Sequence, residues 1–193
     1  VFRLIKEESK ESYTILDMGC ADGSMLRNIA LAARKRNINV KLVGVDLSKD
    51  ALTLASKLSV DYPEISYHIK DILTADFSDF KCDVVTTTLT MHHFPDKEIL
   101  KFIKQFERLS SLGIVINDLQ RSSLAYSLFK LFSLVFIRTK TAAIDGLISI
   151  SKGFKRNDLE GYANKLPNLE HKITWKWAFR YVWVMRKKRQ NNI

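Results

Sequence analysis

Cysteine and proline are scarce in this sequence, which has two cysteines and three prolines among 193 residues. Two cysteines cannot build a disulfide framework, so we expect a reduced, cytoplasmic setting. No Pro/Gly/Ser-rich linker, internal repeat or low-complexity tract divides the chain, and we predict one domain over residues 1–193. We expect no leader peptide. The longest apolar stretch, residues 122–137, is too short to span a bilayer comfortably.

Glycine is sparse as well, but two of the seven glycines bound one short loop. Asp17 ends a short apolar run, Gly19 and Gly23 follow it, and residues 24–36 have a helical pattern. A strand, a glycine loop and a helix N-terminus together form a nucleotide cradle, because glycine lets the backbone approach a ligand closely. The dinucleotide pattern Gly-x-Gly-x-x-Gly is absent, and Asp22 adds a second carboxylate to the loop. Two carboxylates repel a pyrophosphate and favour a ligand with a cationic end.

Acidic residues also end the next two predicted strands. Asp46 follows an apolar strand, where a carboxylate can accept hydrogen bonds from both ribose hydroxyls of a nucleoside. Asp71 ends the strand after that and could face an adenine amino group. An acid after a strand is more often a turn or N-cap residue. Three such acids in register beside a glycine loop nevertheless favour a nucleoside site.

Apolar runs alternate with helical patterns along the chain. Strands are predicted near 13–18, 40–45, 65–70, 83–89 and 112–117, and helices near 24–36, 48–59, 96–109 and 119–137. A capping box starting at Asn157 opens a last helix, and strands follow at 170–177 and 178–187 with no room for a crossover between them. We therefore predict an α/β, Rossmann-like doubly wound sheet of about seven strands, mostly parallel with an antiparallel terminal strand.

These motifs resemble those of the class I S-adenosylmethionine-dependent methyltransferases. Ile15–Gly23 matches the family's glycine motif, Val43–Ser48 its ribose acid, and Cys82–Phe94 its fourth strand and the following segment. The resemblance implies methyl transfer with S-adenosylmethionine as the cofactor. It also implies an N-terminal lid, which we expect to be absent from this sequence. One departure is Ala21, where the family often has a glycine. The cofactor-binding residues that the resemblance implies are Asp17, Gly19, Cys20, Ala21, Gly23, Asp46, Leu47, Asp71, Ile72 and Thr88.

Polar residues after the fourth and fifth strands should face the cofactor, since parallel sheets bind ligands at the carboxyl ends of their strands. His93 or His92 is the candidate general base for a phenolic or hydroxyl proton, and the alternative is a histidine that packs under the sheet and caps the next helix. We expect Asn117 to cap a helix or contact substrate, and Arg121 to orient an anionic or phenolate oxygen. Asn117 and Asp118 would suit Mg²⁺, but a single acid there leads us to predict no metal site.

The apolar stretch at 122–137 has three interpretations: a core helix, a lid over an apolar substrate, or a membrane-surface helix. We favour a substrate cap inserted at 119–154, which would create an apolar pocket. This region is loosely similar to bacterial methyltransferases of the ubiquinone/menaquinone-biosynthesis type and to relatives that act on phenolic lipids. That similarity implies O- or C-methylation of a small phenolic, quinone-like or lipid-like acceptor.

The net charge of +10 favours other partners, namely nucleic acid or an anionic membrane. Basic clusters lie at 34–36 and 186–189, but the first ends a predicted helix and the second is typical of a solvated tail. No aromatic-and-basic stripe is present, and the Asn-Pro-Pro-Tyr-type motif of base N-methyltransferases is absent. An RNA methyltransferase is therefore our second hypothesis, and a non-catalytic adenosyl-binding or membrane-associated protein is the third.

Overall fold

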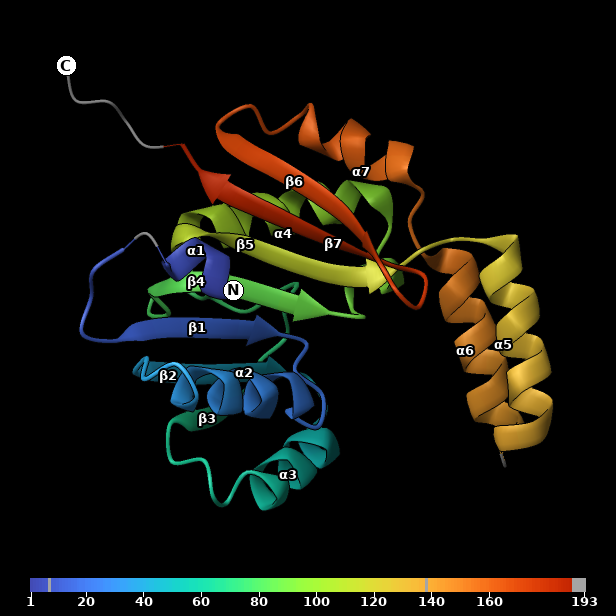
Figure 1. The fold of residues 1–193 in the computed structure, drawn as a ribbon, viewed down its shortest axis with the longest axis horizontal. Coiled ribbons are helices and arrows are strands. Elements are labelled where there is room, and N and C mark those ends of the chain that lie inside the picture. Colours follow the sequence, from blue (N-terminus) through green and yellow to red (C-terminus); the bar gives the residue numbers. More distant parts are fainter. Residues whose placement is uncertain (7, 138, 189–193) are drawn as a thin grey trace.

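Seven strands form a single sheet in the order β3-β2-β1-β4-β5-β7-β6 (Figure 1). The structure is a computed structural model that describes residues 1–6, 8–137 and 139–188. The strands are β1 (Tyr13–Met18), β2 (Val40–Asp46), β3 (Ile65–Ile69), β4 (Cys82–Thr88), β5 (Ser110–Leu119), β6 (Leu169–Lys176) and β7 (Arg180–Lys187). The helices are α1 (Phe2–Ile5), α2 (Ser24–Arg34), α3 (Lys49–Leu58), α4 (Asp96–Leu109), α5 (Ser123–Phe136), α6 (Lys140–Lys152) and α7 (Arg156–Ala163), with a 3₁₀ turn at Met91–His93.

The strand directions confirm the predicted doubly wound sheet. Strands β1 to β5 are mutually parallel, whereas β7 lies antiparallel between β5 and β6. The chain winds outward from β1 through β2 to β3, then crosses back to β4 on the other side of β1. A ligand crevice forms at such a reversal, outside the carboxyl ends of the strands. Because β7 is reversed, its first residue lies at this same edge.

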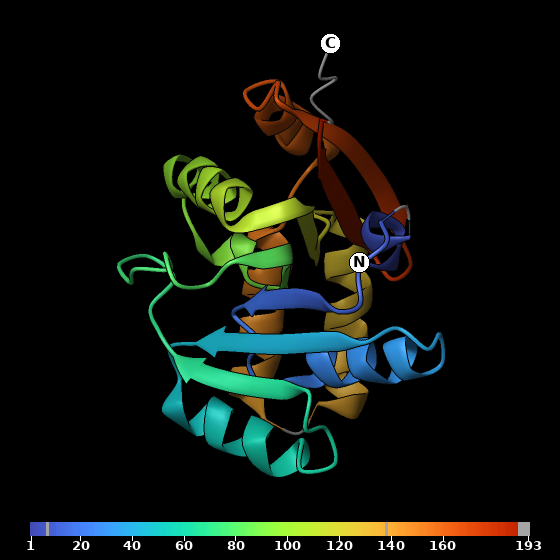
Figure 2. The ribbon, with the colours of Figure 1, turned by 90° about the vertical axis from the view of Figure 1, so that its left-hand side faces the viewer.

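Alternate residues of each central strand enter two separate cores, because successive side chains of a strand point to opposite faces. On β1, Leu16 and Met18 join the core that α4 and α7 cover, whereas Tyr13 and Ile15 join the core under α1, α2 and α3. Figure 2 shows the sheet with a helical layer on each side. Burial on both faces explains why these strands read as continuous apolar runs.

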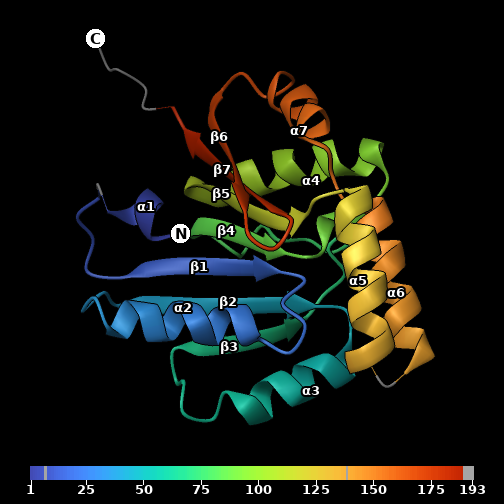
Figure 3. The same ribbon diagram turned by 45° about the vertical axis from the view of Figure 1, so that its right-hand side comes forward.

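Helix α5 occupies most of the helix predicted over 119–137, and α6 is a second helix that was not predicted. Helices α5 and α6 lie side by side as a hairpin at the edge toward which β1, β4 and β5 point (Figures 1 and 3). Gly146 of α6 allows this contact, since a Cβ there would lie 2.3 Å from the ring of Phe129 on α5. No helix within the described ranges has the length and hydropathy needed to cross a membrane.

Two predicted helix caps are wrong. Ser122, rather than Asn117, caps α5, and its Oγ accepts a hydrogen bond from the amide of Ala125 at 3.3 Å. Asn117 cannot cap α5 because β5 continues through this residue to Leu119. The last helix begins two residues earlier than expected, with Lys155 as its N-cap; the Lys155 amide donates to Asp158 Oδ2 at 2.8 Å.

Gly113 on β5 provides a test of the β5–β7 pairing that brings the last strand to the sheet. A Cβ at Gly113 would lie 2.1 Å from the carbonyl oxygen of Met185 on β7. We expect Gly113→Ala to lower the free energy of unfolding by about 1–3 kcal/mol, as overpacking does in other cores. The measurement is chemical denaturation followed by circular dichroism.

Gly161 is the matched control, because it lies exposed in α7 and a Cβ there would meet nothing within 4 Å. Gly161→Ala should stabilise the protein by roughly 0.5–1 kcal/mol through lower backbone entropy in the unfolded chain. Equal effects of the two substitutions would contradict the tight β5–β7 contact.

Candidate active site

The glycine loop after β1 is held against the end of β2. The amides of Gly19 and Cys20 both donate to the carbonyl oxygen of Val45, at 2.8 and 3.0 Å. Gly19 adopts a φ of 76°, and a Cβ there would lie 2.6 Å from Thr90 Oγ1. Gly23 is the N-cap of α2. The loop therefore needs glycine for its backbone conformation and for close approach, as the sequence predicts.

Asp46 at the end of β2 also holds this loop. Its Oδ2 accepts from the amide of Ala21 at 2.9 Å, and its Oδ1 accepts from the amide of Ser48 at 2.9 Å. Ala21 has a φ of 46°, a left-handed conformation that costs a non-glycine residue roughly 1–2 kcal/mol. The Asp46 carboxylate thus stabilises the strained loop while keeping lone pairs available for further donors.

A cleft of about 580 Å³ lies at this loop. We call it the glycine-loop cleft, and its lining is Asp17, Gly19, Cys20, Ala21, Ser24, Met25, Asn28, Asp46, Thr88, Leu89, Thr90, His93 and Arg180. Two buried polar atoms of this lining, Asp17 Oδ1 and Thr88 Oγ1, have no hydrogen-bond partner among the described residues. Buried polar groups without partners are rare in proteins, so these atoms indicate a place for a polar ligand.

The Asp17 carboxyl is the strongest electrostatic feature of the cleft. Its side chain is 1% exposed, and burial, followed by the negative charge of Asp46, raises its pKa to about 7. Burial also raises the pKa of the Cys20 thiol, so this neighbour adds no negative charge. A cationic group beside Asp17 would favour the ionised carboxylate. The cleft therefore fits a ligand with a cationic end. Asp22, the second carboxylate behind that expectation, lies outside the lining and pairs with Arg27 instead.

Four of the predicted cofactor residues lie outside this lining. Asp71 accepts hydrogen bonds from Leu73 N and Thr74 Oγ1, at 2.8 and 3.0 Å, which is the turn role weighed as its alternative. Ile72 packs against the core under α4. The roles of these residues in binding an adenine stay predictions. The four residues outside the lining are Gly23, Leu47, Asp71 and Ile72.

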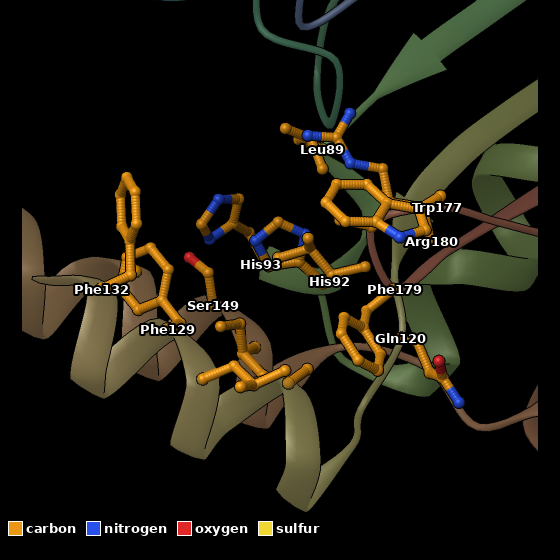
Figure 4. Close-up of a pocket in the computed structure, with 16 residues that line it drawn as sticks. Leu89, His92, His93, Gln120, Phe129, Phe132, Ser149, Trp177, Phe179 and Arg180 are labelled. Atoms are coloured by element: carbon orange, nitrogen blue, oxygen red, sulfur yellow. The ribbon is translucent and has the colours of Figure 1, made fainter.

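A second cavity, of about 550 Å³, adjoins the glycine-loop cleft. We call it the apolar cavity, and its wall comes from α5, α6, the β6–β7 turn and the segments after β4 and β5 (Figure 4). Most of its side chains are aliphatic or aromatic, so it suits an apolar ligand. Its lining is Leu89, His92, His93, Leu119, Gln120, Ala125, Leu128, Phe129, Phe132, Gly146, Ser149, Ile150, Trp177, Ala178, Phe179 and Arg180.

His92 is fixed by the carboxylate of Asp118, which lies at the end of β5. Its Nδ1 is 2.6 Å from Asp118 Oδ1, and both side chains are 2% exposed. A carboxylate only accepts, so the hydrogen of this bond is on Nδ1. Asp118 Oδ2 also accepts from the amides of Met91 and His92. Within the described parts of the chain, no three His, Cys, Asp or Glu residues are grouped to hold a metal.

His93 lies where the two cavities meet. It lines both of them, as do Leu89 and Arg180. The side chain of His93 is exposed, and the pKa of its imidazole is lowered by partial burial and then by neighbouring His92. A lowered pKa keeps the imidazole neutral and able to accept a proton near pH 7. Of the two predicted base candidates, His93 has the accessible ring, whereas His92 Nε2 is buried.

The two residues predicted to bind substrate lie outside both linings. Arg121 donates to Asp158 Oδ2 on α7 at 2.7 Å, and its guanidinium is engaged there. The backbone oxygen of Asn117 accepts from the amide of Leu89 at 2.9 Å, which places Asn117 within the β4–β5 framework. A role for either side chain in substrate binding stays a prediction without support from this geometry. The cation at the junction is instead Arg180, which the sequence did not single out.

A protein-family model described as a methyltransferase domain matches residues 15–113, just over half of the chain. The chain belongs to the class I S-adenosylmethionine-dependent methyltransferases. The match covers the glycine loop, Asp46 and the histidine segment, so the resemblance drawn from those residues is confirmed for the family. The methyltransferase fold also accounts for the strand order and the reversed β7.

Individual relatives match over part of their length. Tocopherol O-methyltransferase from Arabidopsis thaliana is 32% identical over 108 residues, which are 56% of this chain and 30% of that protein. Ubiquinone biosynthesis O-methyltransferase from Hydrogenovibrio crunogenus is 32% identical over 91 residues, 46% of this chain and 35% of that protein. This methyltransferase chain thus spans about a third of the length of these relatives. The plantazolicin methyltransferase BpumL, solved with SAH, shares the fold with a TM-score of 0.73 at 18% identity, over 97% of this chain and 80% of that one.

The raised pKa of Asp17 predicts a pH-dependent affinity for the cofactor product S-adenosylhomocysteine, whose ammonium favours the ionised carboxylate. Affinity should fall as pH is lowered through about 7, by up to about tenfold per pH unit, because the carboxyl must lose a proton before it can pair. Titration calorimetry on both sides of this pH measures the effect. Asp17→Asn should bind more weakly at high pH, and its affinity should not vary across this range.

The same carboxyl sets a stability trend in the protein without ligand. The pKa of Asp17 in the folded protein lies above the ordinary value of 3.8, because burial disfavours the charged carboxylate. The free energy of unfolding should therefore be highest below pH 3.8 and should decrease as the pH rises toward about 7. Asp17→Asn should abolish this part of the pH dependence. A flat affinity profile in the unmodified protein would contradict the role of Asp17.

Proposed function

We propose that this protein transfers a methyl group from S-adenosylmethionine to an oxygen or carbon of a small apolar acceptor of phenolic, quinone-like or lipid-like character. The observation that carries the proposal is the junction of two unlike cavities. A polar cleft with two carboxylates meets an apolar cavity at His93, Leu89 and Arg180. Methyl transfer depends mainly on the alignment of the methyl donor with the acceptor atom. Two adjoining cavities can hold these two molecules in such an alignment.

The cofactor would be held by residues of the glycine-loop cleft. Asp17 would pair with its ammonium, and the unpartnered Oδ1 of Asp17 supports this assignment. Asp46 would accept from the ribose hydroxyls with the lone pairs that Ala21 and Ser48 leave free. When bound, S-adenosylmethionine supplies an electrophilic methyl group on its sulfonium.

His93 is the proposed general base. Its neutral imidazole would take the proton from an acceptor hydroxyl, because its ring is accessible and its pKa is lowered. His92 would act as a positioning residue: its bond to Asp118 fixes the 3₁₀ turn that carries His93. Ring centroids of the two histidines are 4.1 Å apart, so a change in His92 is felt directly by His93.

The lining of the apolar cavity supports the proposed acceptor class. Phe129, Phe132 and Trp177 surround the histidines (Figure 4), and aromatic walls favour flat, apolar ligands. The names of two relatives, which refer to tocopherol and ubiquinone biosynthesis, point to acceptors of the same chemistry for those proteins. The α5–α6 hairpin would then be the substrate cap expected at 119–154.

RNA stays the second choice of acceptor, because three arginines of the basic clusters have partners within the protein. Arg34 forms two 2.8 Å hydrogen bonds to the carboxylate of Glu64, and Arg36 lies 4.7 Å from the ring centroid of Phe2. Arg186 donates to the carbonyl oxygen of Arg3 at 2.9 Å. These contacts explain part of the positive charge without a nucleic acid. Arg189, the last member of the C-terminal cluster, lies outside the described residues.

Contact of the hairpin with an anionic membrane surface is a further part of the proposal. Leu131, Leu134, Val135 and Phe136 of α5 are exposed by 63–77%. Between residues 122 and 154 the sequence has four basic residues and one acidic residue, which complements anionic lipid. Such contact would place the mouth of the apolar cavity beside dissolved apolar acceptors.

His93→Gln is the direct test of the proposed activity. Methyl transfer from labelled S-adenosylmethionine to 2-naphthol and to an alkylated hydroquinone should fall about 10²–10⁴-fold. Cofactor affinity by calorimetry should be unchanged, since only the base is lost. In the unmodified protein the rate should fall on the acid side of an apparent pKa below 6.5, because protonated imidazole cannot accept a proton.

His92→Gln serves as the matched comparison, and it should lower the melting temperature through loss of a buried bond to Asp118. His93→Gln should leave the melting temperature unchanged. If the unmodified protein binds S-adenosylhomocysteine but methylates neither probe, the acceptor class is wrong. If it binds neither S-adenosylmethionine nor S-adenosylhomocysteine, the enzyme proposal is wrong and the non-catalytic hypothesis replaces it.

The membrane proposal predicts co-sedimentation with vesicles of equimolar phosphatidylcholine and phosphatidylglycerol, and little with phosphatidylcholine alone. Leu134→Glu should abolish binding, and Lys130→Gln should weaken it about fivefold, the effect of one surface cation near anionic lipid. Val60→Glu is the control, because Val60 is 81% exposed but lies outside the hairpin. Equal binding to both vesicle types, or equal losses in all three variants, would refute a specific hairpin contact.

A further inference from the structure

Among the residues that the structure describes, Arg180 is the only arginine or lysine in the lining of either cavity, and it belongs to both. It is the first residue of β7, where its backbone pairs with Leu119 on β5 and Lys176 on β6. This pairing fixes its Cα at the edge of the sheet. The side chain is half-buried and lies near Leu89 and Trp177 at one end of the apolar cavity (Figure 4).

The guanidinium of Arg180 makes no hydrogen bond or ion pair with any residue that the structure describes. Other arginines of the chain do pair with carboxylates: Arg27 with Asp22, Arg34 with Glu64, Arg121 with Asp158 and Arg156 with Glu160. The Arg180 guanidinium is half-buried and therefore has donors available for an anionic ligand.

Charge is distributed unevenly over the two joined cavities. Asp17 and Asp46 make one end of the glycine-loop cleft negative. The described lining of the apolar cavity holds no Asp or Glu, and Arg180 is the one fixed charge there. A ligand of the apolar cavity that carries an anion at one end would therefore find a partner at the junction, beside His93.

We propose that Arg180 binds the anionic group of the acceptor, and that the acceptor is therefore an apolar aromatic acid or phenolate. This inference rests on the proposed function, because it deepens the class of acceptor. A guanidinium offers a planar fork of donors that matches a carboxylate, so it orients the ring as well as attracting it. Arg180 thus takes the role that the sequence assigned to Arg121.

The cofactor's own carboxylate is a second source of the same chemistry. It could reach Arg180, since this residue also lines the glycine-loop cleft. We assign Arg180 to the acceptor because no other arginine, lysine, aspartate or glutamate lies in the part of the apolar cavity that the structure describes. The two sources are separated by measuring ligands of the two cavities independently.

The first measurement compares two dyes that share the anilinonaphthalene ring system. 1-Anilinonaphthalene-8-sulfonate is anionic, and N-phenyl-1-naphthylamine is its neutral counterpart. Fluorescence titration should give the anionic dye about tenfold or greater preference in the unmodified protein, as expected for a charge-assisted pair. Arg180→Met should remove the preference and leave affinity for the neutral dye unchanged, and Arg180→Lys should restore part of it.

Two control variants locate the effect. Lys176→Met removes an equal charge from the neighbouring strand, outside both linings, and should keep the preference. Ser149→Phe fills the apolar cavity and should abolish the high-affinity binding of both dyes. An unchanged preference in Arg180→Met would overturn the proposal, as would an equal loss in Lys176→Met.

The second measurement compares S-adenosylhomocysteine with 5′-methylthioadenosine, which lacks the amino-acid end. Arg180→Met should bind both as tightly as the unmodified protein does. If it loses affinity for S-adenosylhomocysteine alone, Arg180 binds the cofactor carboxylate and the assignment to the acceptor is overturned. Failure of the unmodified protein to bind S-adenosylhomocysteine would instead count against the proposed function, which the dye measurements do not depend on.

Discussion

A single buried carboxylate, Asp118, ties together the two loops on which the site depends. It ends β5, and it accepts hydrogen bonds from the His92 ring and from the amides after β4. The position of the 3₁₀ turn relative to β5 is thereby fixed, and with it the wall between the two cavities. The carboxylate is 2% exposed, so these bonds form in a medium of low dielectric, where losing one partner is costly.

The parts of the fold and site that depend on local sequence could be predicted. The strand, glycine loop and helix around Gly19 are contiguous, and their signals (an apolar run, glycine spacing and helical periodicity) all lie within about one supersecondary unit. Helix α4 was predicted with its observed ends because Pro95 and a strongly amphipathic pattern define it. Asp46 and Asp17 followed from the rule that parallel strands bring their carboxyl ends to one edge.

The other features of the site depend on contacts between residues far apart in the chain, which local sequence patterns do not predict. Arg121 was expected at the site because β5 was predicted to end at residue 117. The strand instead runs to Leu119, and the bridge between Gln120 and Phe154 carries Arg121 on to α7. Arg180 was missed because it lies about 60 residues after the end of β5 in the sequence. Only the antiparallel pairing of β7 with β5 brings it to the edge of the sheet where the cavities lie. The weak periodicity of residues 140–152 likewise hid α6.

The antiparallel placement of β7 has a consequence for the order in which the protein is made. The cradle around Gly19 uses residues 13–46 and 88–93, all of which precede β7 in the chain. The junction of the cavities closes only when residues 177–180 arrive and β7 docks on β5. The glycine loop and the end of β2 are therefore complete in the sequence before the residues that close the junction are added. Arg180 is the exception in the glycine-loop cleft, because β7 supplies it together with the wall of the apolar cavity.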